Sequence, residues 1–444
     1  MSLRQYIHSP VSILPLVTFR VLFGMVMLVG TIRFVANGWV DLLYVKPSFY
    51  FPFWDVSWLK PLSQTGMYLL FGVMALAALG IALGAYYRFS TWTFFLSFTF
   101  VELLDKTNYL NHYYFVSVVA LLLCFLPANR AVSWDVWRNP ELSSAQVPRW
   151  VVGCLRFQIG LVYFFAGVAK LNPDWMFHAL PLKIWLEAKT DLPLLGSWLG
   201  QDWVAFGFSW FGALYDLSVP FFLFWNFSRP WAYATVVVFH LMTWLLFPIG
   251  MFPFIMILGT LVFFPAEVHA TFWNKLKWIP VAKPTVVLNV GWAWIVVLSL
   301  LVIQTLFPLR SWLYPGNLFW TEQGFRFSWR VMLMEKAGHA TFRVRDPRTG
   351  YESEVNNRVH LTPYQEKMMS TQPDMILQYA HHLDAVFRNQ GIPDPEVYAD
   401  VFVALNGRGS RRFVNPKVDL SQERDGWRHK DWILPYEGAE YSQK

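Results

Sequence analysis

Ionisable side chains occur inside long apolar stretches of this sequence. They are Arg20, Arg33, Glu102, His112, Arg156, Lys170, Asp216 and His240. At membrane depth such groups are costly, and they usually face the interior of a helix bundle or a wet cavity. One interpretation is structural, with Glu102 and Asp216 forming ion pairs with the arginines of this set. The other is that some of these groups form a chemical site.

Three of these residues are predicted to lie at a similar depth. Glu102 ends one apolar stretch, His112 begins the next, and Lys170 ends the one after that. Successive membrane spans alternate in direction, so all three should lie near the outer face of the bilayer. The short turn between Glu102 and His112 adds further polar groups, namely Asp105, Lys106, Asn108 and Asn111.

Lys170 has a specific chemical use at such a place. Removing an ammonium from water disfavours its charged form, and a neutral amine can act as a general base. His112 can hold that amine by a hydrogen bond. Arg156 and Tyr163 precede Lys170 at intervals of seven residues, so the three share one helix face. The alternative is a snorkelling Lys170 whose ammonium simply reaches the interface.

The composition indicates a membrane protein. Of 444 residues, 55% are hydrophobic, 19% are aromatic and only 15% are charged, whereas soluble domains carry about a quarter charged residues. The formal net charge of +7 comes without a basic run, and Lys and Arg are enriched in cytosolic membrane loops. We therefore expect no nucleic-acid partner.

The apolar stretches predict a membrane all-α bundle of about eight to nine transmembrane helices, because about 20 apolar residues cross the hydrocarbon core. The predicted spans are 12–36, 66–86, 88–104, 112–127, 150–172, 202–226, 230–248, 252–264 and 288–308. The excess of Lys and Arg in alternate loops favours a cytosolic N-terminus. We thus predict two parts: a transmembrane domain, 1–308, and a small extracytosolic α+β domain, 309–444.

Two strands and a helix are predicted in the C-terminal part. Residues His339 to Arg345 and Tyr398 to Leu405 alternate like half-buried strands. Thr362 and Pro363 are a typical helix start, and the helix should continue towards Gly391.

Metal catalysis has no support in the sequence. The two cysteines, Cys124 and Cys154, both lie in apolar stretches, so neither a disulfide framework nor a thiolate metal site is expected. His381 and His382 are adjacent on the predicted helix and point to different faces, which favours a solvated pair. The sequence around Gly407-Arg-Gly409 is interpreted as a turn rather than a phosphate loop.

Two segments resemble the vitamin K-dependent γ-glutamyl carboxylase family. One is Leu104-Asp-Lys-Thr-Asn-Tyr-Leu-Asn-His112, and the other is Tyr163-Phe-Phe-Ala-Gly-Val-Ala-Lys170-Leu-Asn-Pro-Asp-Trp175, which is similar to the segment with the family's catalytic lysine. Shorter similarities follow in the family's order, at Phe19-Arg20-Val-Leu-Phe-Gly24, Phe239-His240, Ile249-Gly-Met-Phe252, Phe327-Ser-Trp329 and Arg412-Phe-Val-Asn-Pro416-Lys-Val-Asp419.

The resemblance implies that Lys170 deprotonates reduced vitamin K. The resulting anion reacts with O₂ to form a stronger base, which removes a γ-proton from a peptide glutamate; CO₂ then adds, and vitamin K epoxide remains. By the same resemblance His112 tunes the lysine with Asn111 beside it, and His240 and His339 line the site. Tyr163, Arg156, Asp105 and Lys106 are our further candidates for quinone or substrate binding.

The chain also departs from the animal members of the family. Those continue beyond the equivalent of Lys444 in an extension that serves propeptide binding, and their luminal disulfide cannot form here. We therefore expect a short homologue of bacterial type, in an inner membrane with its C-terminal domain in the periplasm rather than the ER lumen. The sequence agrees with this, because its one Asn-x-Ser/Thr sequon, Asn226-Phe-Ser228, is predicted at a cytosolic span end and none is predicted outside the cytosol.

Three functions remain open from the sequence. The first is carboxylation of a glutamate-containing peptide or protein outside the cytosol, with reduced vitamin K or menaquinol as co-substrate. The second is quinol epoxidation without carboxylation. The third is a non-enzymatic quinone-binding membrane protein or transporter, in which the buried charges line a path.

Overall fold

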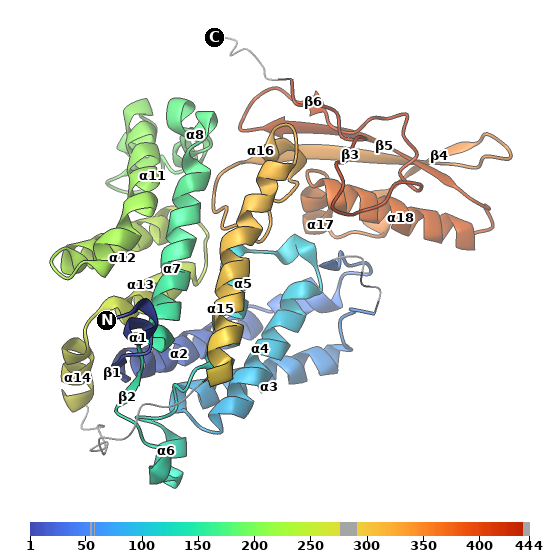
Figure 1. The fold of residues 1–444 in the computed structure, drawn as a ribbon. Helices are drawn as coiled ribbons and strands as arrows, with labels where there is room; N and C mark the ends of the chain where they lie inside the picture. The colour runs from blue at the N-terminus through green and yellow to red at the C-terminus, as the bar shows by residue number, and fades with distance from the viewer. Residues whose placement is uncertain (54–55, 57, 276–290, 438–444) are drawn as a thin grey trace.

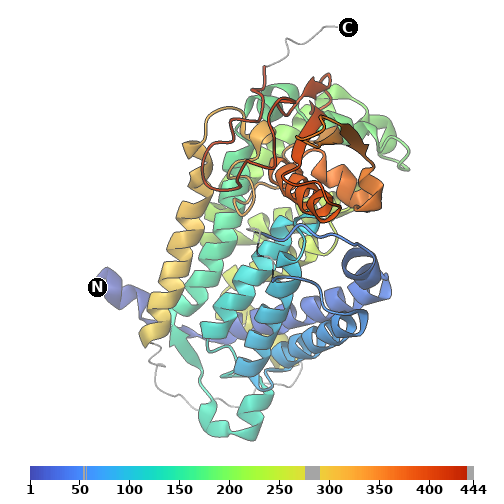
Figure 2. The ribbon, with the colours of Figure 1, turned by 90° about the vertical axis from the view of Figure 1, so that its right-hand side faces the viewer.

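The computed structural model describes residues 1–53, 56, 58–275 and 291–437. It is mostly helical, with a small β-sheet near the C-terminus (Figure 1). The helices up to α15 form a bundle, and the sheet lies at the end of the bundle where α7 gives way to α8 (Figures 1 and 2).

The longer helices of the bundle correspond to the apolar stretches of the sequence, except the helix over residues 266–275, which lies outside the predicted spans. They are α2 (Leu14–Ala36), α3 (Gln64–Leu83), α4 (Tyr87–Leu103), α5 (Asn111–Phe125), α7 (Arg149–Lys170), α11 (Asp202–Phe224), α12 (Arg229–Leu246), α13 (Phe252–Thr260), α14 (Ala266–Lys275) and α15 (Gly291–Leu306). Shorter elements connect them: α1 (Leu3–Ile7), η1 (Asp41–Val45), η3 (Lys106–Asn108), α6 (Trp134–Arg138), η4 (Pro140–Leu142), α8 (Pro173–His178), α9 (Leu182–Glu187), α10 (Gly196–Leu199), η5 (Leu261–Phe263) and η6 (Phe307–Leu313).

Five of these helical segments are long and apolar enough to cross a membrane within the described residues. They are Leu14–Ala36, Gln64–Leu83, Arg149–Lys170, Asp202–Phe224 and Gly291–Leu313. A sixth is possible if Phe252–Phe263 and Ala266–Lys275, which meet at a bend of 112°, count as one broken span. The protein is thus helical and membrane-embedded, but the predicted count of eight to nine spans is not confirmed.

Length is one physical reason for the difference. Helix α5 has 15 residues, and a rise of about 1.5 Å per residue makes it shorter than a hydrocarbon core of about 30 Å. Residues 288–290 of the last predicted span lie outside the described residues.

Arg20 binds backbone carbonyls instead of a carboxylate. Its guanidinium is fully buried and donates to the carbonyl oxygens of Val132 at 2.6 Å, Ala128 at 3.0 Å and Ala82 at 3.3 Å. These carbonyls belong to the end of α3 and to the segment after α5. Arg20 therefore closes one end of the bundle, and this is a structural role.

The C-terminal part is a four-stranded antiparallel sheet packed against two helices (Figure 1). The strand order is β4 (Glu352–Val355), β3 (Lys336–Arg345), β5 (Glu396–Leu405) and β6 (Arg411–Arg412). The expected strands are confirmed in β3 and β5, which pair along their length from Lys336 with Leu405 to Arg345 with Glu396.

The helix predicted after Thr362 is present, but it is divided in two. Thr362 caps α17 (Pro363–Met369) in a capping box with Gln365, and α18 (Pro373–Asn389) follows. Pro373 explains the break, because proline disfavours helical conformation in the residue before it. A short α16 (Leu318–Thr321), η7 (Asn357–Val359) and a two-stranded pairing of β1 (Pro10–Ser12) with β2 (Gln146–Pro148) complete the fold.

Candidate functional site

Lys170 forms a buried ion pair with Asp216. The Lys170 Nζ atom donates to Asp216 Oδ2 at 2.6 Å, and the side chains are only 7% and 6% exposed. The ammonium also contacts the Ala166 carbonyl at 3.3 Å and lies 5.3 Å from the centre of the Trp175 ring. A buried charge is tolerated only when it is paired, so this pair explains how both residues stay inside the bundle.

The local sequence places Lys170 at the last residue of α7. The chain turns at Asn172, whose side chain accepts the Trp175 N–H at 3.0 Å and caps α8. Trp175 is thereby held beside the lysine, and its indole N–H donates to the Ser209 carbonyl at 2.7 Å. Lys170 and Trp175 therefore keep a fixed relation to α11.

A glycine brings α7 close to α11 at the ion pair. A Cβ atom at Gly167 would lie 2.7 Å from the backbone nitrogen of Leu217 and 3.0 Å from the carbonyl carbon of Asp216. Such contacts are shorter than real Cβ atoms allow, so only glycine permits this approach. One turn beyond Asp216, Pro220 has no N–H to donate to the Asp216 carbonyl.

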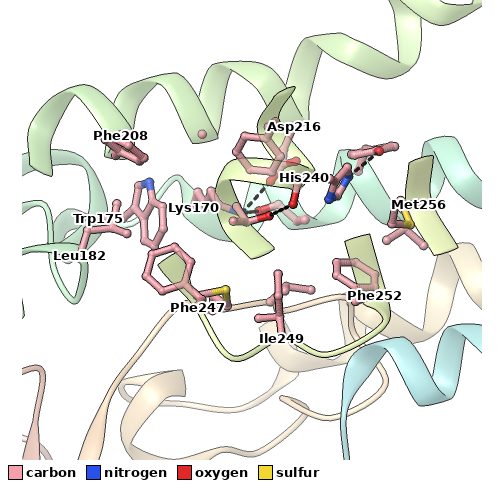
Figure 3. A pocket seen from close by; sticks show the side chains of 18 of the residues that line it. Lys170, Trp175, Leu182, Phe208, Asp216, His240, Phe247, Ile249, Phe252 and Met256 are labelled. Atoms are coloured by element: carbon pink, nitrogen blue, oxygen red, sulfur yellow. Dashed lines mark hydrogen bonds and ion pairs between the residues drawn. The ribbon is translucent and has the colours of Figure 1, made fainter. Parts of the chain in front are cut away.

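The ion pair faces a cavity of about 90 Å³ with mostly apolar walls. Lys170, Asp216 and His240 lie on one side of it, and Phe247, Ile249 and Phe252 lie across from them (Figure 3). Further walls come from Val162, Tyr163, Ala166, Trp175, Leu182, Trp185, Phe208, Gly212, Phe239, Thr243, Met256, Val331 and Met332. The arrangement places an amine and a carboxylate at the surface of an otherwise apolar, aromatic space.

Tyr163 and His240 form a second polar group in the same cavity. The Tyr163 hydroxyl and His240 Nε2 are 2.9 Å apart, and both side chains are buried. The other ring nitrogen of His240, Nδ1, is buried without a hydrogen-bond partner among the described residues. A buried polar atom without a partner is rare in proteins, so Nδ1 is available to a bound molecule.

His112 and Asn111 line a neighbouring cavity of about 330 Å³ instead. Arg33, Glu102 and Tyr113 are among its other walls. Asn111 donates to the Arg330 carbonyl at 2.6 Å, and His112 stacks on Phe252 with ring centres 5.5 Å apart. The expected hydrogen bond between His112 and Lys170 is replaced by the Lys170–Asp216 pair.

The two cavities share one wall. Ile249, Phe252, Val331 and Met332 line both of them, and the Phe252 ring lies between His112 and His240, 5.5 Å and 5.9 Å from their ring centres. The predicted residues are therefore brought into adjoining spaces, with Lys170, Tyr163 and His240 on one side and His112 and Asn111 on the other.

Four predicted site residues have other contacts. Arg156 donates to the Val262 carbonyl at 2.9 Å, near the bend between α13 and α14, and is not part of either cavity wall. Asp105 accepts from Gln365 at 3.0 Å, and Lys106 pairs with Asp374 at 3.0 Å, so both bind the C-terminal part. His339 is exposed on β3, on the face of the strand opposite to the buried Ala340.

The acidic residues of the apolar stretches have partners that the sequence did not predict. Asp216 pairs with Lys170, and Glu102 accepts the Ser117 hydroxyl at 2.6 Å rather than an arginine. The position of Asp216 in an apolar helix marked it as unusual, but only the packing of α11 on α7 identifies its partner. The residues from Phe247 to Phe252 form a wall of the cavity. In the sequence this segment was marked only by the short family similarity at Ile249 to Phe252.

The adjacent histidines on α18, expected to be solvated, are half-buried and each contacts another protein group. The His382 ring is tilted against that of Phe49 with ring centres 4.3 Å apart, and its Nε2 lies 3.4 Å from His360 Nδ1, whereas His381 contacts the Glu423 carbonyl at 2.8 Å. In the part of the chain that the structure describes, no group of three or more His, Cys, Asp or Glu side chains is arranged to hold a metal ion.

Comparison with known families covers both parts of the chain. Residues 8–267 match the HTTM domain, and residues 291–439 match the vitamin K-dependent gamma-carboxylase lumenal domain. No solved structure matches this chain. Together the two matches show that the chain belongs to the vitamin K-dependent gamma-carboxylase family.

Proposed function

We propose that this protein is a vitamin K-dependent γ-glutamyl carboxylase and epoxidase in which Lys170 is the initiating base. The observation that carries the proposal is the buried amine of Lys170 at the surface of an apolar cavity. Family membership supports the use of reduced vitamin K, O₂ and CO₂ and a glutamate-containing substrate.

The cavity suits the ring of a quinol. Trp175, Phe247 and Phe252 supply flat apolar walls, and aromatic rings favour stacked or edge contacts with one another. The Lys170–Asp216 pair and the free Nδ1 of His240 supply polar groups for the two ring oxygens. Menaquinol has the same ring, so the proposal covers both quinols.

The chain's own residues then have defined tasks. Lys170 removes a proton from a quinol hydroxyl, and the apolar walls exclude water, which strengthens electrostatic interactions and protects reactive species. The oxygenated quinol supplies the stronger base that takes the γ-proton of a peptide glutamate, and CO₂ adds to the resulting carbanion. We place Asn111 and His112 in the adjoining cavity, behind the shared wall of Phe252.

The C-terminal part lies outside the cytosol in this proposal, as the match to a lumenal domain supports. A peptide substrate then approaches from that side, and the lipid-soluble quinol arrives from the bilayer. In a bacterial cell this corresponds to the inner membrane and the periplasm.

The test uses the purified full-length protein with a short glutamate peptide, labelled CO₂ and either reduced vitamin K or menaquinol. We expect both epoxide and labelled peptide from the wild type, and neither from Lys170→Ala. Lys275→Ala, which changes an exposed lysine at the end of α14, should behave like the wild type.

Undiminished epoxide from Lys170→Ala would overturn the assignment of the base. Epoxide without labelled peptide would favour a quinol epoxidase that does not carboxylate protein. No O₂-dependent quinol consumption by the wild type would favour a non-enzymatic quinone-binding protein or transporter.

A further inference from the structure

The Lys170–Asp216 contact raises a question about the proposed base. A lysine in a 2.6 Å ion pair carries a proton and cannot accept another. We propose that Asp216 takes this proton from Lys170, so that the freed amine accepts the quinol proton. This inference rests on the proposed function and makes Asp216 the acceptor of the proton that Lys170 carries before the reaction.

The geometry suits a proton transfer within the pair. Nζ and Oδ2 are joined by one short hydrogen bond between two side chains that are less than a tenth exposed. Lys170 is the one hydrogen-bond donor to the Asp216 carboxylate in the described parts of the chain. The other hydrogen-bond acceptor of the Lys170 ammonium is the Ala166 carbonyl at 3.3 Å, and a backbone carbonyl cannot take a proton.

The step balances in atoms and charge. The pair starts as an ammonium and a carboxylate. An N–H bond of Lys170 breaks and an O–H bond forms on Asp216, which gives a neutral amine beside a neutral acid. The quinol O–H bond then breaks, and its proton forms a new N–H bond on Lys170. An ammonium, a carboxylic acid and a quinol anion result, so the net charge of the cavity does not change.

Charge neutrality is the physical advantage of this arrangement. A new net charge in an apolar cavity is costly, but here the anion forms beside the ammonium that has just gained its proton. A lone lysine would instead have to release its proton to water before the quinol arrives. The pair keeps the proton inside the site.

The other titratable groups around the pair are bound elsewhere or lack a charge. Tyr163 of α7 and His240 of α12 bond to each other at 2.9 Å, and Tyr215 of α11 packs against Tyr163 with ring centres 5.8 Å apart. On α8, Asp174 is paired with Arg408 of the C-terminal part. On α9, Lys183 pairs with Asp202 of α11 at 3.0 Å.

The pH dependence of epoxidation at saturating quinol tests the proposal. With Asp216 as the acceptor, the wild type should lose activity only in the acidic range where carboxylates gain protons. In Asp216→Asn, Lys170 accepts a proton only after it has lost one to solvent. The ordinary pKa is near 10.4 for a lysine and near 4 for a carboxyl group, and burial lowers a lysine pKa by at most about 3–5 units. The acidic limb of the pH–rate profile of Asp216→Asn should therefore lie at least about one pH unit above that of the wild type.

Two controls accompany this variant. Asp216→Glu keeps a carboxylate, and the ordinary pKa values of the two acids are similar. The acidic limb of its pH–rate profile should therefore stay within about half a pH unit of that of the wild type. Asp202→Asn changes a 77%-exposed acid on the same helix and should leave the profile unchanged. Size-exclusion chromatography and thermal unfolding in detergent report whether each variant is folded.

Each outcome decides the matter. An upward shift in Asp216→Asn supports the proposal. A downward shift would show that Asp216 only holds Lys170 in its charged form, and a lower rate with an unmoved limb would show a structural role; both overturn it. If Asp216→Asn does not fold, the wild-type profile decides, because an activity that rises only in the alkaline, lysine range also overturns it. Absence of epoxide from the wild type would instead refute the proposed function.

Discussion

Lys106, in the turn between α4 and α5, forms an ion pair with Asp374 of α18 at 3.0 Å. Arg326 reaches the same carboxylate at 2.5 Å. The lysine is 3% exposed and the other two side chains are 16–17% exposed. One carboxylate of the C-terminal part thus pairs with two largely buried cations, one of which belongs to the helical bundle, and this relationship ties one part to the other.

Replacing Asp374 should strongly destabilise the protein. Asp374→Asn removes the carboxylate that pairs with both Lys106 and Arg326, and breaking a buried pair from one side costs about 3–5 kcal/mol. Thermal unfolding in detergent measures the loss. Arg343→Gln, which breaks the 37–40%-exposed pair with Glu352, is the control and should cost no more than about 1 kcal/mol. Equal effects of the two variants would contradict this role.

The same carboxylate should make the protein sensitive to strong acid. Burial alone would raise the pKa of Asp374, but the charges and hydrogen bonds of Arg326 and Lys106 outweigh it and hold the pKa well below its ordinary value. A depressed folded-state pKa contributes stability above the unfolded value, near 3.9, that is lost as the pH falls below it. Asp374→Asn should therefore unfold with a weaker pH dependence than the wild type below about pH 4.

His382 should make the stability depend on pH in a milder range. Burial, and next the charge of His360, lower the pKa of His382 to about 4. The unfolded chain binds this proton near pH 6.5 and the folded chain does not, so stability should fall as the pH drops from about 6.5 to 4. Unfolding temperatures at pH 7.5 and 5 measure the effect. His382→Gln should reduce the difference between them; a difference as large as that of the wild type would contradict the assignment.

Gly167 should be essential to the site. Gly167→Val places atoms against the backbone of α11, separates Lys170 from Asp216 and should lower epoxidation at least about tenfold, the cost of about 1.4 kcal/mol in the barrier. Gly153→Ala, on the same helix with open space around its Cβ position, should leave the activity within twofold, on the order of a few tenths of a kcal/mol. Tolerance of valine at position 167 would show that the close approach is not needed.

Phe252 should determine how well the quinol is held. Phe252→Ala removes the ring between His112 and His240 and joins the two cavities. Each lost aromatic contact is worth about 0.5–1.5 kcal/mol, so KM for the quinol should rise about 3- to 10-fold. Steady-state kinetics with a range of quinol concentrations separates KM from kcat. An unchanged KM would place the quinol away from this wall.

Local signals in the sequence predicted the elements well. Apolar stretches marked the helices, alternation marked β3 and β5, and Thr362 with Pro363 marked the start of α17. The number of spans was harder to predict. Several stretches, such as α5 and α13, are apolar but short or bent, and an apolar helix of that length can also be buried within a bundle.

The sequence by itself determined that Lys170 ends an apolar helix beside Trp175, because capping by Asn172 and the turn at Pro173 are local. It also determined that Asp216 lies deep in another apolar helix. Only the tertiary structure decided that these two residues, 46 positions apart, form a hydrogen-bonded ion pair, and that Phe252 lies between their cavity and His112. The reason is that a buried charge requires a partner, but the choice of partner depends on which helices pack together, and that choice depends on side chains along the whole length of each helix.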